Sequence, residues 1–286
     1  MSANLRGALF MVLAMIGFAI EDALFKSATG AGLSPGLGTL IFGLLGFTAF
    51  FVQARRKGPV WSPAFLRGWL LIRTGFEILG RVFFALSLAY TPLATTSAIL
   101  QATPLVVTLG AALALGEQVG PRRWAAMAVG FCGVLLILRP GPDSLGIAAL
   151  LPILGMIGFA GRDLATRASP PEISSAQLGV LGFGVVSVAG LLILVSEGAL
   201  PAAPAPLQLM KIGGVALAGV LAYTALTRAM RSGEVSVVAP FRYSRLLVAL
   251  VFAYAFFGER PDSLMLVGAT LIVVSGVYTL WRSGRA

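Results

Sequence analysis

The 286-residue sequence contains no histidine and a single cysteine, Cys132. A metal site built from imidazole ligands is therefore excluded, and no intramolecular disulfide can form. Charged residues are also scarce, at 11% of the chain, whereas a typical globular domain carries about 25%. Because so few charges cannot cover a soluble surface, the sequence predicts an integral membrane protein.

Apolar residues make up 58% of the sequence, and the mean hydropathy is +0.93. A membrane-spanning helix needs about 20 such residues, so the length allows about ten spans with short connections. Breaks rich in glycine and proline separate apolar runs at 5–27, 37–54, 67–89, 94–116, 122–139, 145–166, 175–196, 207–230, 235–257 and 263–281. The expected fold class is an all-α integral membrane protein with ten transmembrane helices.

The net charge of +10 could indicate nucleic-acid binding, but the basic residues mostly lie at the ends of apolar runs. With the N-terminus in the cytoplasm, the inner ends hold Arg6, Arg55, Arg56, Lys57, Arg67, Arg122, Arg123, Arg167, Arg228, Arg231, Arg282 and Arg285, and the outer ends hold Lys26, Arg139, Lys211 and Arg260. An excess of basic residues on the cytoplasmic side is typical of membrane proteins. We expect a bacterial cytoplasmic (inner) membrane protein in contact with lipid, with both termini cytoplasmic and no nucleic-acid partner. Monomer and dimer both stay open.

The sequence also repeats itself. Residues 15–19 recur as residues 156–160, so Asp22 aligns with Asp163 at an offset of 141. The other matches are Ala85-Leu86-Ser87 with Ala225-Leu226-Thr227, at an offset of 140, and Gly116-Glu117 with Gly258-Glu259, at 142. We therefore expect two five-helix repeats, 1–143 and 144–286. Because five is odd, the repeats are inverted relative to each other, as in many secondary transporters with a site near mid-membrane.

With these repeats, the chain resembles the drug/metabolite transporter superfamily, in particular its ten-helix EamA-type branch. The resemblance covers essentially the whole length, and its most specific residues are the Gly-Glu pairs at 116–117 and 258–259. It implies ten helices around a central cavity, alternating access and export of small metabolites. Within the superfamily the chain is most similar to bacterial amino-acid exporters, including the aromatic amino-acid type. One departure is Phe241-Arg242-Tyr243-Ser244-Arg245, where the first repeat has Ile99-Leu100-Gln101-Ala102-Thr103.

Charged residues inside the expected spans indicate where a site could lie. Arg73, Glu77 and Arg81 recur every four residues and share one face of the third span. At about 1.5 Å rise per residue, Glu77 lies near the midplane and Arg81 just beyond it. Arg73 lies close to the inner interface, where its side chain could extend to the headgroups. Charges in lipid are costly, so the stripe should face protein or a wet cavity.

The ninth span brings Arg242 and Arg245 to a similar depth and on one face. Arginine suits a carboxylate, and Glu77 could hold an ammonium group or carry a proton. The residues expected to bind substrate are Glu77, Arg81, Gln101, Arg242, Tyr243 and Arg245. The alternative is a salt bridge from Glu77 to Arg73 or Arg81 that only fixes helix packing.

Glu21, Asp22, Arg162 and Asp163 occupy equivalent places in the two repeats and are candidates for gating or for capping the cavity. The alternative for them is ordinary interface solvation or salt bridges between the repeats. Pro104 and Pro240 predict kinks in the fourth and ninth spans, because proline removes a backbone hydrogen bond. Glu117 and Glu259 are expected to hold helix ends.

These features favour a secondary transporter that exports amino acids or similar small zwitterions by alternating access. A second possibility is an organic-anion or phosphorylated-metabolite carrier, because the third and ninth spans are net positive. A lipid-modifying membrane enzyme would need a cluster of His, Asp or Glu at one membrane face, which the sequence does not provide. A channel is also possible, but inverted repeats favour alternating access. No catalytic residue, metal or cofactor is expected, because the sequence contains no Walker, dinucleotide-binding or metal-ligand motif.

Overall fold

The computed structural model describes residues 2–90, 99–139, 149–198, 202–257 and 262–283. Within them the chain forms α1 (Ala3–Thr29), α2 (Pro35–Arg55), η1 (Pro63–Leu66), α3 (Gly68–Tyr90), α5 (Thr103–Ala114), α6 (Pro121–Leu138), α7 (Leu150–Arg167), α8 (Ser175–Ser196), α9 (Pro206–Met230), α10 (Val235–Val238), η4 (Ala239–Tyr243), α11 (Ser244–Phe257) and α12 (Ser263–Ser283). The described part contains no strand, which confirms the expected all-α membrane fold.

Helical segments occur in all ten expected spans. Six helices are long and apolar enough to cross a membrane: α1, α2, α6, α8, α9 and α12. Helices α3 and α7 are also at least 18 residues long, but each carries three charged residues. The fourth and ninth spans are not continuous helices. The chain turns at Gln101 and Ala102 before α5, and the ninth span is divided into α10, η4 and α11.

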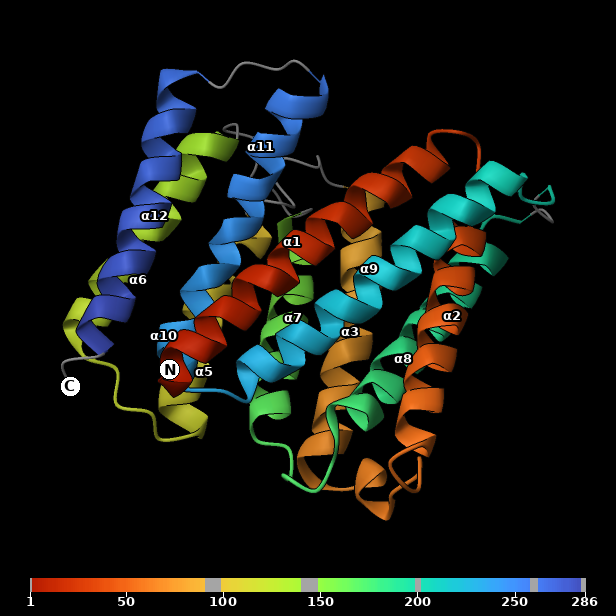
Figure 1. Cartoon of the computed structure of the whole chain (residues 1–286), viewed down its shortest axis with the longest axis horizontal. Helices are drawn as coiled ribbons and strands as arrows, with labels where there is room; N and C mark the ends of the chain where they lie inside the picture. Colours follow the sequence, from red (N-terminus) through yellow and green to blue (C-terminus); the bar gives the residue numbers. More distant parts are fainter. Residues whose placement is uncertain (1, 91–98, 140–148, 199–201, 258–261, 284–286) are drawn as a thin grey trace.

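The long helices pack in pairs that join the two halves of the chain. α1 runs along α9, α3 along α7, α2 along α8 and α6 along α12 (Figure 1). In the two halves, α1 corresponds to α7, α3 to α9, α2 to α8 and α6 to α12. The α1–α9 pair is therefore equivalent to the α7–α3 pair, and each of the other two pairs joins two corresponding helices. This pattern is the one that two inverted repeats generate. The division between residues 143 and 144 stays a prediction.

Close helix contacts give the register between the halves. A Cβ on Gly158 would collide with the backbone of Gly80, and a Cβ on Gly17 would lie 2.8 Å from Cβ of Ala222. Because Gly17 and Gly158 correspond at an offset of 141, Ala222 corresponds to Gly80 at 142. These contacts favour an offset of 142 for α3 and α9, two residues more than the offset of 140 read from residues 85–87.

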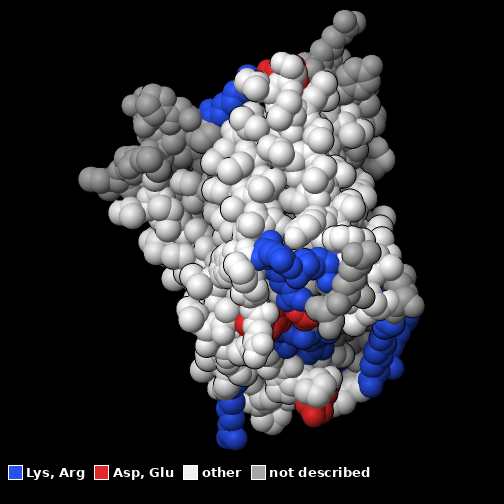
Figure 2. All heavy atoms as spheres, turned by 90° about the vertical axis from the view of Figure 1, so that its left-hand side faces the viewer, with Lys and Arg blue, Asp and Glu red and all other residues white. Residues whose placement is uncertain are grey.

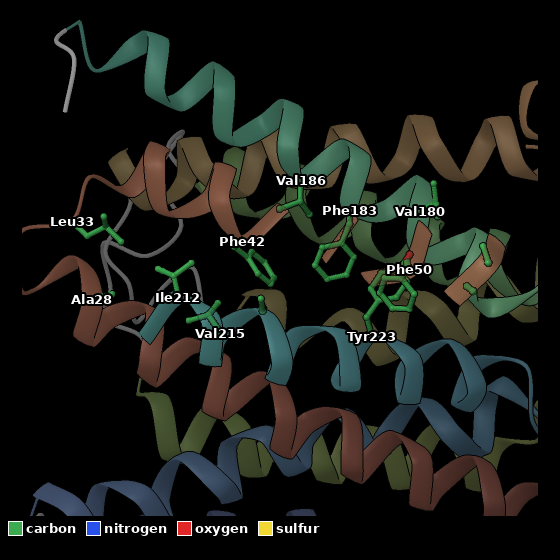
Figure 3. Close-up of a cluster of buried hydrophobic side chains, with 13 residues drawn as sticks. Ala28, Leu33, Phe42, Phe50, Val180, Phe183, Val186, Ile212, Val215 and Tyr223 are labelled. Atoms are coloured by element: carbon green, nitrogen blue, oxygen red, sulfur yellow. The ribbon is translucent and has the colours of Figure 1, made fainter. Parts of the chain in front are cut away.

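An aromatic core fills the space between α2, α8 and α9. The ring of Phe183 lies 5.2 Å from Phe42, 5.4 Å from Phe50 and 5.5 Å from Tyr223, centroid to centroid (Figure 3). Such edge-on and tilted contacts are favourable for aromatic rings. The Tyr223 hydroxyl donates to the carbonyl of Leu178 at 3.1 Å. The core thus fixes the position of the Tyr223 side chain, whose hydroxyl also reaches the charged residues of α3.

α1 begins and α12 ends at the same end of the bundle, at the lower left of Figure 1. Figure 2 shows the side of the molecule that lies at the left of Figure 1. On this side, basic side chains gather from mid-height downwards, and the upper part is largely uncharged apart from a small group near the top edge. This uneven distribution agrees with the basic excess expected at the cytoplasmic end, and the orientation of the termini in the membrane stays a prediction.

Candidate functional site

Glu77 lies at the centre of a buried network of charges. Its side chain, on α3, is 0% exposed. Oε2 accepts a hydrogen bond from Nη2 of Arg73 at 3.1 Å, and Oε1 accepts one from Nη1 of Arg162 on α7 at 3.2 Å. Nε of Arg81 lies 3.8 Å from the same Oε1. The salt bridges to Arg73 and Arg81, which were the alternative interpretation of this stripe, are therefore both present, together with a third arginine from the other half of the chain.

Arg73 is the largest fully buried side chain of the network, with 1% exposure. Its Nε donates to Oγ1 of Thr166 at 3.1 Å, and its Nη2 also donates to the hydroxyl of Tyr223. The expectation that Arg73 extends to the headgroups was wrong. The physical reason is that the start of α3 is covered by a small core around Leu70 and Leu178, so Arg73 is enclosed by protein.

Asp163 connects this network to the broken ninth span. Its Oδ1 accepts from Nε and Nη2 of Arg162, at 3.0 and 2.8 Å, and its Oδ2 accepts from Nη1 of Arg242 in η4. The Asp163 side chain is 2% exposed. Buried ions are tolerated when they are paired and hydrogen-bonded, as they are here. The structure thus brings together Glu77, Arg81, Arg162, Asp163 and Arg242.

Asp22 and Arg245 form a separate and more open pair. Nε of Arg245 donates to Oδ2 of Asp22 at 3.1 Å, and Nη2 contacts the same atom. Their side chains are 40% and 56% exposed for Arg245 and Asp22. The Arg245 guanidinium also lies 5.7 Å from the ring centroid of Phe18. The two aspartates that correspond in the repeats therefore each hold one arginine of the ninth span, one pair buried and one open.

Four buried side-chain polar atoms of the described residues have no hydrogen-bond partner: Oε2 of Glu21, Nε of Arg81, Nη1 of Arg73 and the hydroxyl of Tyr243. The Arg81 guanidinium lies 5.8 Å from the Phe159 ring centroid, and Arg162 lies 5.3 Å from the same centroid. Cations over an aromatic face at this distance are attracted to it. Phe159 thus provides an aromatic surface between two arginines.

Two expected site residues lie away from the network. Tyr243 is fully buried, but it packs in a core with Val134, Ile137 and Ile272 of α6 and α12. Its ring therefore packs in this apolar core and not in the charge network. Gln101 lies in the turn before α5, and none of the hydrogen bonds of the charge network, within the described ranges, involves it.

The interruptions in the fourth and ninth spans position this region. Pro104 is the second residue of α5, and Pro240 lies in η4. The kinks predicted from these prolines are confirmed. Because the helix is interrupted, Arg242 in η4 and Arg245 in α11 reach two different aspartates, on α7 and α1. Transporter sites commonly lie where such discontinuous helices meet near mid-membrane.

A second polar cluster, here called the end cluster, consists of Asn4, Glu117, Arg123 and Glu234. The carboxylate of Glu117 accepts from the backbone N–H of Val235 at 2.9 Å, which confirms its expected role at a helix end. Arg123 donates to Glu234, and Oδ1 of Asn4 accepts from the backbone N–H of Glu234 at 2.8 Å. Burial alone would raise the pKa of Glu234, but the hydrogen bond and charge of Arg123 lower it below its usual 4.5.

Sequence reasoning missed three of the end-cluster residues and also Thr166. Asn4 and Glu234 are 230 positions apart, and Arg73 and Thr166 are 93 apart. No local spacing signals such contacts. Gly258 and Glu259, the second expected Gly-Glu pair, lie outside the described residues.

The charges of the main network do not cancel. Four arginines (Arg73, Arg81, Arg162 and Arg242) are connected to two carboxylates (Glu77 and Asp163), which gives a formal charge of +2. A buried positive excess in an apolar bundle favours an anionic or strongly hydrogen-bond-accepting ligand. The arrangement can bind and orient such a group.

Several known proteins are similar to this chain over most of its length. A riboflavin transporter of Rhizobium johnstonii is 32% identical over 98% of this chain and 92% of its own length. A pseudopaline exporter of Pseudomonas aeruginosa is 27% identical over 94% of each chain. An S-adenosylmethionine uptake transporter of Rickettsia conorii is 24% identical over 85% of this chain and 80% of its own.

One solved structure covers 98% of this chain and 98% of its own, with a TM-score of 0.77 and 19% identity. That likeness supports the fold alone. The model of the EamA-like transporter family matches residues 5–139 and again residues 146–281. The chain therefore belongs to the EamA-like transporter family of the drug/metabolite transporter superfamily, and it is a multi-pass membrane transporter rather than an enzyme.

Proposed function

We propose that this transporter moves a small metabolite bearing a carboxylate or another strong hydrogen-bond acceptor, by alternating access around the charged centre of the bundle. The observation that carries the proposal is the excess of two positive charges in a network that is otherwise buried. Arg81 of this network and Arg245 of the separate Asp22 pair are accessible, with side chains 27% and 40% exposed. They are the cations that a substrate can reach.

Within this proposal, Glu77 positions the arginines rather than holding a substrate ammonium. Its side chain is fully buried and its two oxygens contact Arg73, Arg81 and Arg162. An ammonium group could bind it only by displacing one of these cations. Arg242 is held by Asp163 in the same way, so we place it behind the contact surface formed by Arg81 and Arg245.

The first substrate class is amino acids and similar zwitterions, whose carboxylate suits the planar fork of arginine. The second is flavins, and the specific observation in its favour is the 32% identity with a riboflavin transporter. Phe159, flanked by Arg81 and Arg162, would offer a flat ring system a stacking surface. Phosphorylated metabolites form the third class, favoured only by charge.

Export was the direction expected from the resemblance. The names of the relatives include both an uptake transporter and an exporter, so family membership alone does not set the direction. We propose that the direction follows the combined gradients of substrate and any coupled ion.

The test is counterflow in proteoliposomes that contain the purified full chain. Vesicles are loaded with unlabelled L-phenylalanine, L-glutamate, riboflavin or glucose 6-phosphate, and entry of the labelled compound is followed. We expect exchange of at least one carboxylate or flavin compound, at least tenfold slower in Arg245→Ala. The exposed carboxylate Glu172 provides a matched control, and Glu172→Gln should exchange normally. Exchange of glucose 6-phosphate alone would restrict the substrate to the phosphorylated class, whereas full activity of Arg245→Ala would overturn the proposal.

A further inference from the structure

Comparison of the two halves singles out the carboxylate of Glu21, because its counterpart in the other half is part of an ion pair. Arg162 on α7 contacts Glu77 on α3. Under the repeat relation, Arg162 corresponds to Glu21 at an offset of 141, and Glu77 corresponds to Gly219 at the offset of 142 shown by the helix contacts. The two counterparts meet as well, because Oε2 of Glu21 lies 2.9 Å from where a Cβ of Gly219 would stand. One half of the molecule thus has an ion pair where the other half has a carboxylate facing a glycine.

Among the described residues, no cation is in contact with Glu21. No arginine or lysine of the described residues forms an ion pair with it, and its Oε2 is enclosed without a hydrogen bond. The ring of Phe42 would meet the same Cβ at 2.6 Å, so the space beside this oxygen is filled by apolar atoms. A carboxylate oxygen that is enclosed without a hydrogen bond is costly as the anion, and the cost is removed when it binds a proton.

The charges that act on Glu21 come from three elements. Asp22 is its neighbour on α1, Arg81 lies on α3 and Arg245 on α11. The facing residues of α9 and α2 are Gly219 and Phe42, which carry no charge. The two cations are the accessible arginines of the proposed substrate site. The positive field of these arginines offsets only part of the cost of the anion at Glu21, and a substrate acceptor group bound to them weakens that field further.

We propose that Glu21 is the proton-binding residue of this transporter, and that one proton moves with each substrate in the same direction. This inference rests on the proposed function. When a carboxylate or carbonyl oxygen of the substrate takes the N–H donors of Arg81, the Glu21 carboxylate binds a proton from the open side. When the substrate leaves on the other side, the proton returns to water there, and the chemical balance of each cycle is one proton and one substrate.

Proton binding is tested first without any substrate. Infrared spectra of the full chain in liposomes are recorded across the neutral pH range, and the band of the protonated carboxyl is followed. We expect a titrating band in the wild-type protein that is absent in Glu21→Gln and unchanged in Glu172→Gln. An identical titrating band in wild type and Glu21→Gln would overturn the proposal, whatever the substrate proves to be.

Coupling is tested with whichever compound of the counterflow panel exchanges. Vesicles containing a pH-sensitive dye receive that compound outside, and the internal pH is followed. In the wild-type protein, substrate entry should acidify the interior, and an inward proton gradient should accelerate entry several-fold. In Glu21→Gln both effects should disappear while counterflow continues. Acidification that persists in Glu21→Gln contradicts the coupling, whereas failure of counterflow in every protein contradicts the proposed substrate classes instead.

Discussion

The α3–α7 pair and the α1–α9 pair occupy equivalent places in the two halves of the bundle. They differ in their charged residues, which are buried and paired in the first and unpaired or exposed in the second. In the first pair, the buried side chains of Arg73 and Arg162 both contact the buried Glu77. In the second, Glu21 faces a glycine and Asp22 holds an exposed arginine. The difference separates charges that fix the architecture from charges that remain available to a ligand or a proton.

Removing the centre of the α3–α7 network should have the largest effect. Glu77→Gln preserves the shape of the side chain but leaves Arg73 without its countercharge in the bundle interior and Arg162 with Asp163 alone. Breaking a buried ion pair from one side costs about 3–5 kcal/mol. We therefore expect strongly reduced thermal stability in detergent, measured by the unfolding temperature. Glu172→Gln serves as the surface control, and an unchanged unfolding temperature of Glu77→Gln would refute the structural role.

The two arginines of the ninth span allow the same comparison with matched residues. Arg242→Ala removes a partner of the buried Asp163, which retains only Arg162, and should cost about 3 kcal/mol. Arg245→Ala removes an exposed partner and should cost about 1 kcal/mol or less. Transport should nevertheless fall in Arg245→Ala. Equal losses of stability in the two variants would remove the distinction between the pairs.

The ten-span pattern and the broken helices could be predicted from the sequence, because apolar runs and prolines act locally. Glu77 and Arg81 could be recognised because their spacing on one helix is visible in the sequence. The partners of Arg242 and Arg245 could not, since Asp163 and Asp22 lie 79 and 223 positions away. Which aspartate each arginine reaches depends on how the interrupted helix is placed.

The burial of Arg73 shows a second limit of sequence reasoning. The depth expected for Arg73 was calculated from the helical rise per residue and a flat membrane surface. At that depth its side chain could reach the lipid headgroups. The structure instead covers this end of α3 with Phe65 of η1 and with Ile173 and Leu178 near the start of α8. Lateral packing, which determines whether a side chain sees lipid or protein, has no signal in the position of a residue along one span.

Close backbone approach distinguishes the α3–α7 pair in a way that mutation can test. A Cβ on Gly158 would collide with backbone atoms of Gly80, whereas Gly75 on the same pair has open space. Gly158→Ala should therefore separate the helices and cost about 1–3 kcal/mol, while Gly75→Ala should be neutral or slightly stabilising. The measurement is the unfolding temperature of both variants. If Gly158→Ala is as stable as Gly75→Ala, the helices do not approach as closely as described.

The smallest expected effect concerns the end cluster, where the comparison is between charges at the surface and charges in the interior. Because Arg123 lowers the folded-state pKa of Glu234 below 4.5, the pair stabilises the folded protein above that pH. The contribution is lost as pH falls through the lowered value, since the protein must then bind a proton that the unfolded chain binds more readily. Between about pH 6 and about pH 4, the wild-type unfolding temperature should therefore fall slightly more than that of Glu234→Gln. Parallel acid curves would show that this half-exposed pair contributes nothing measurable, unlike the buried pairs around Glu77.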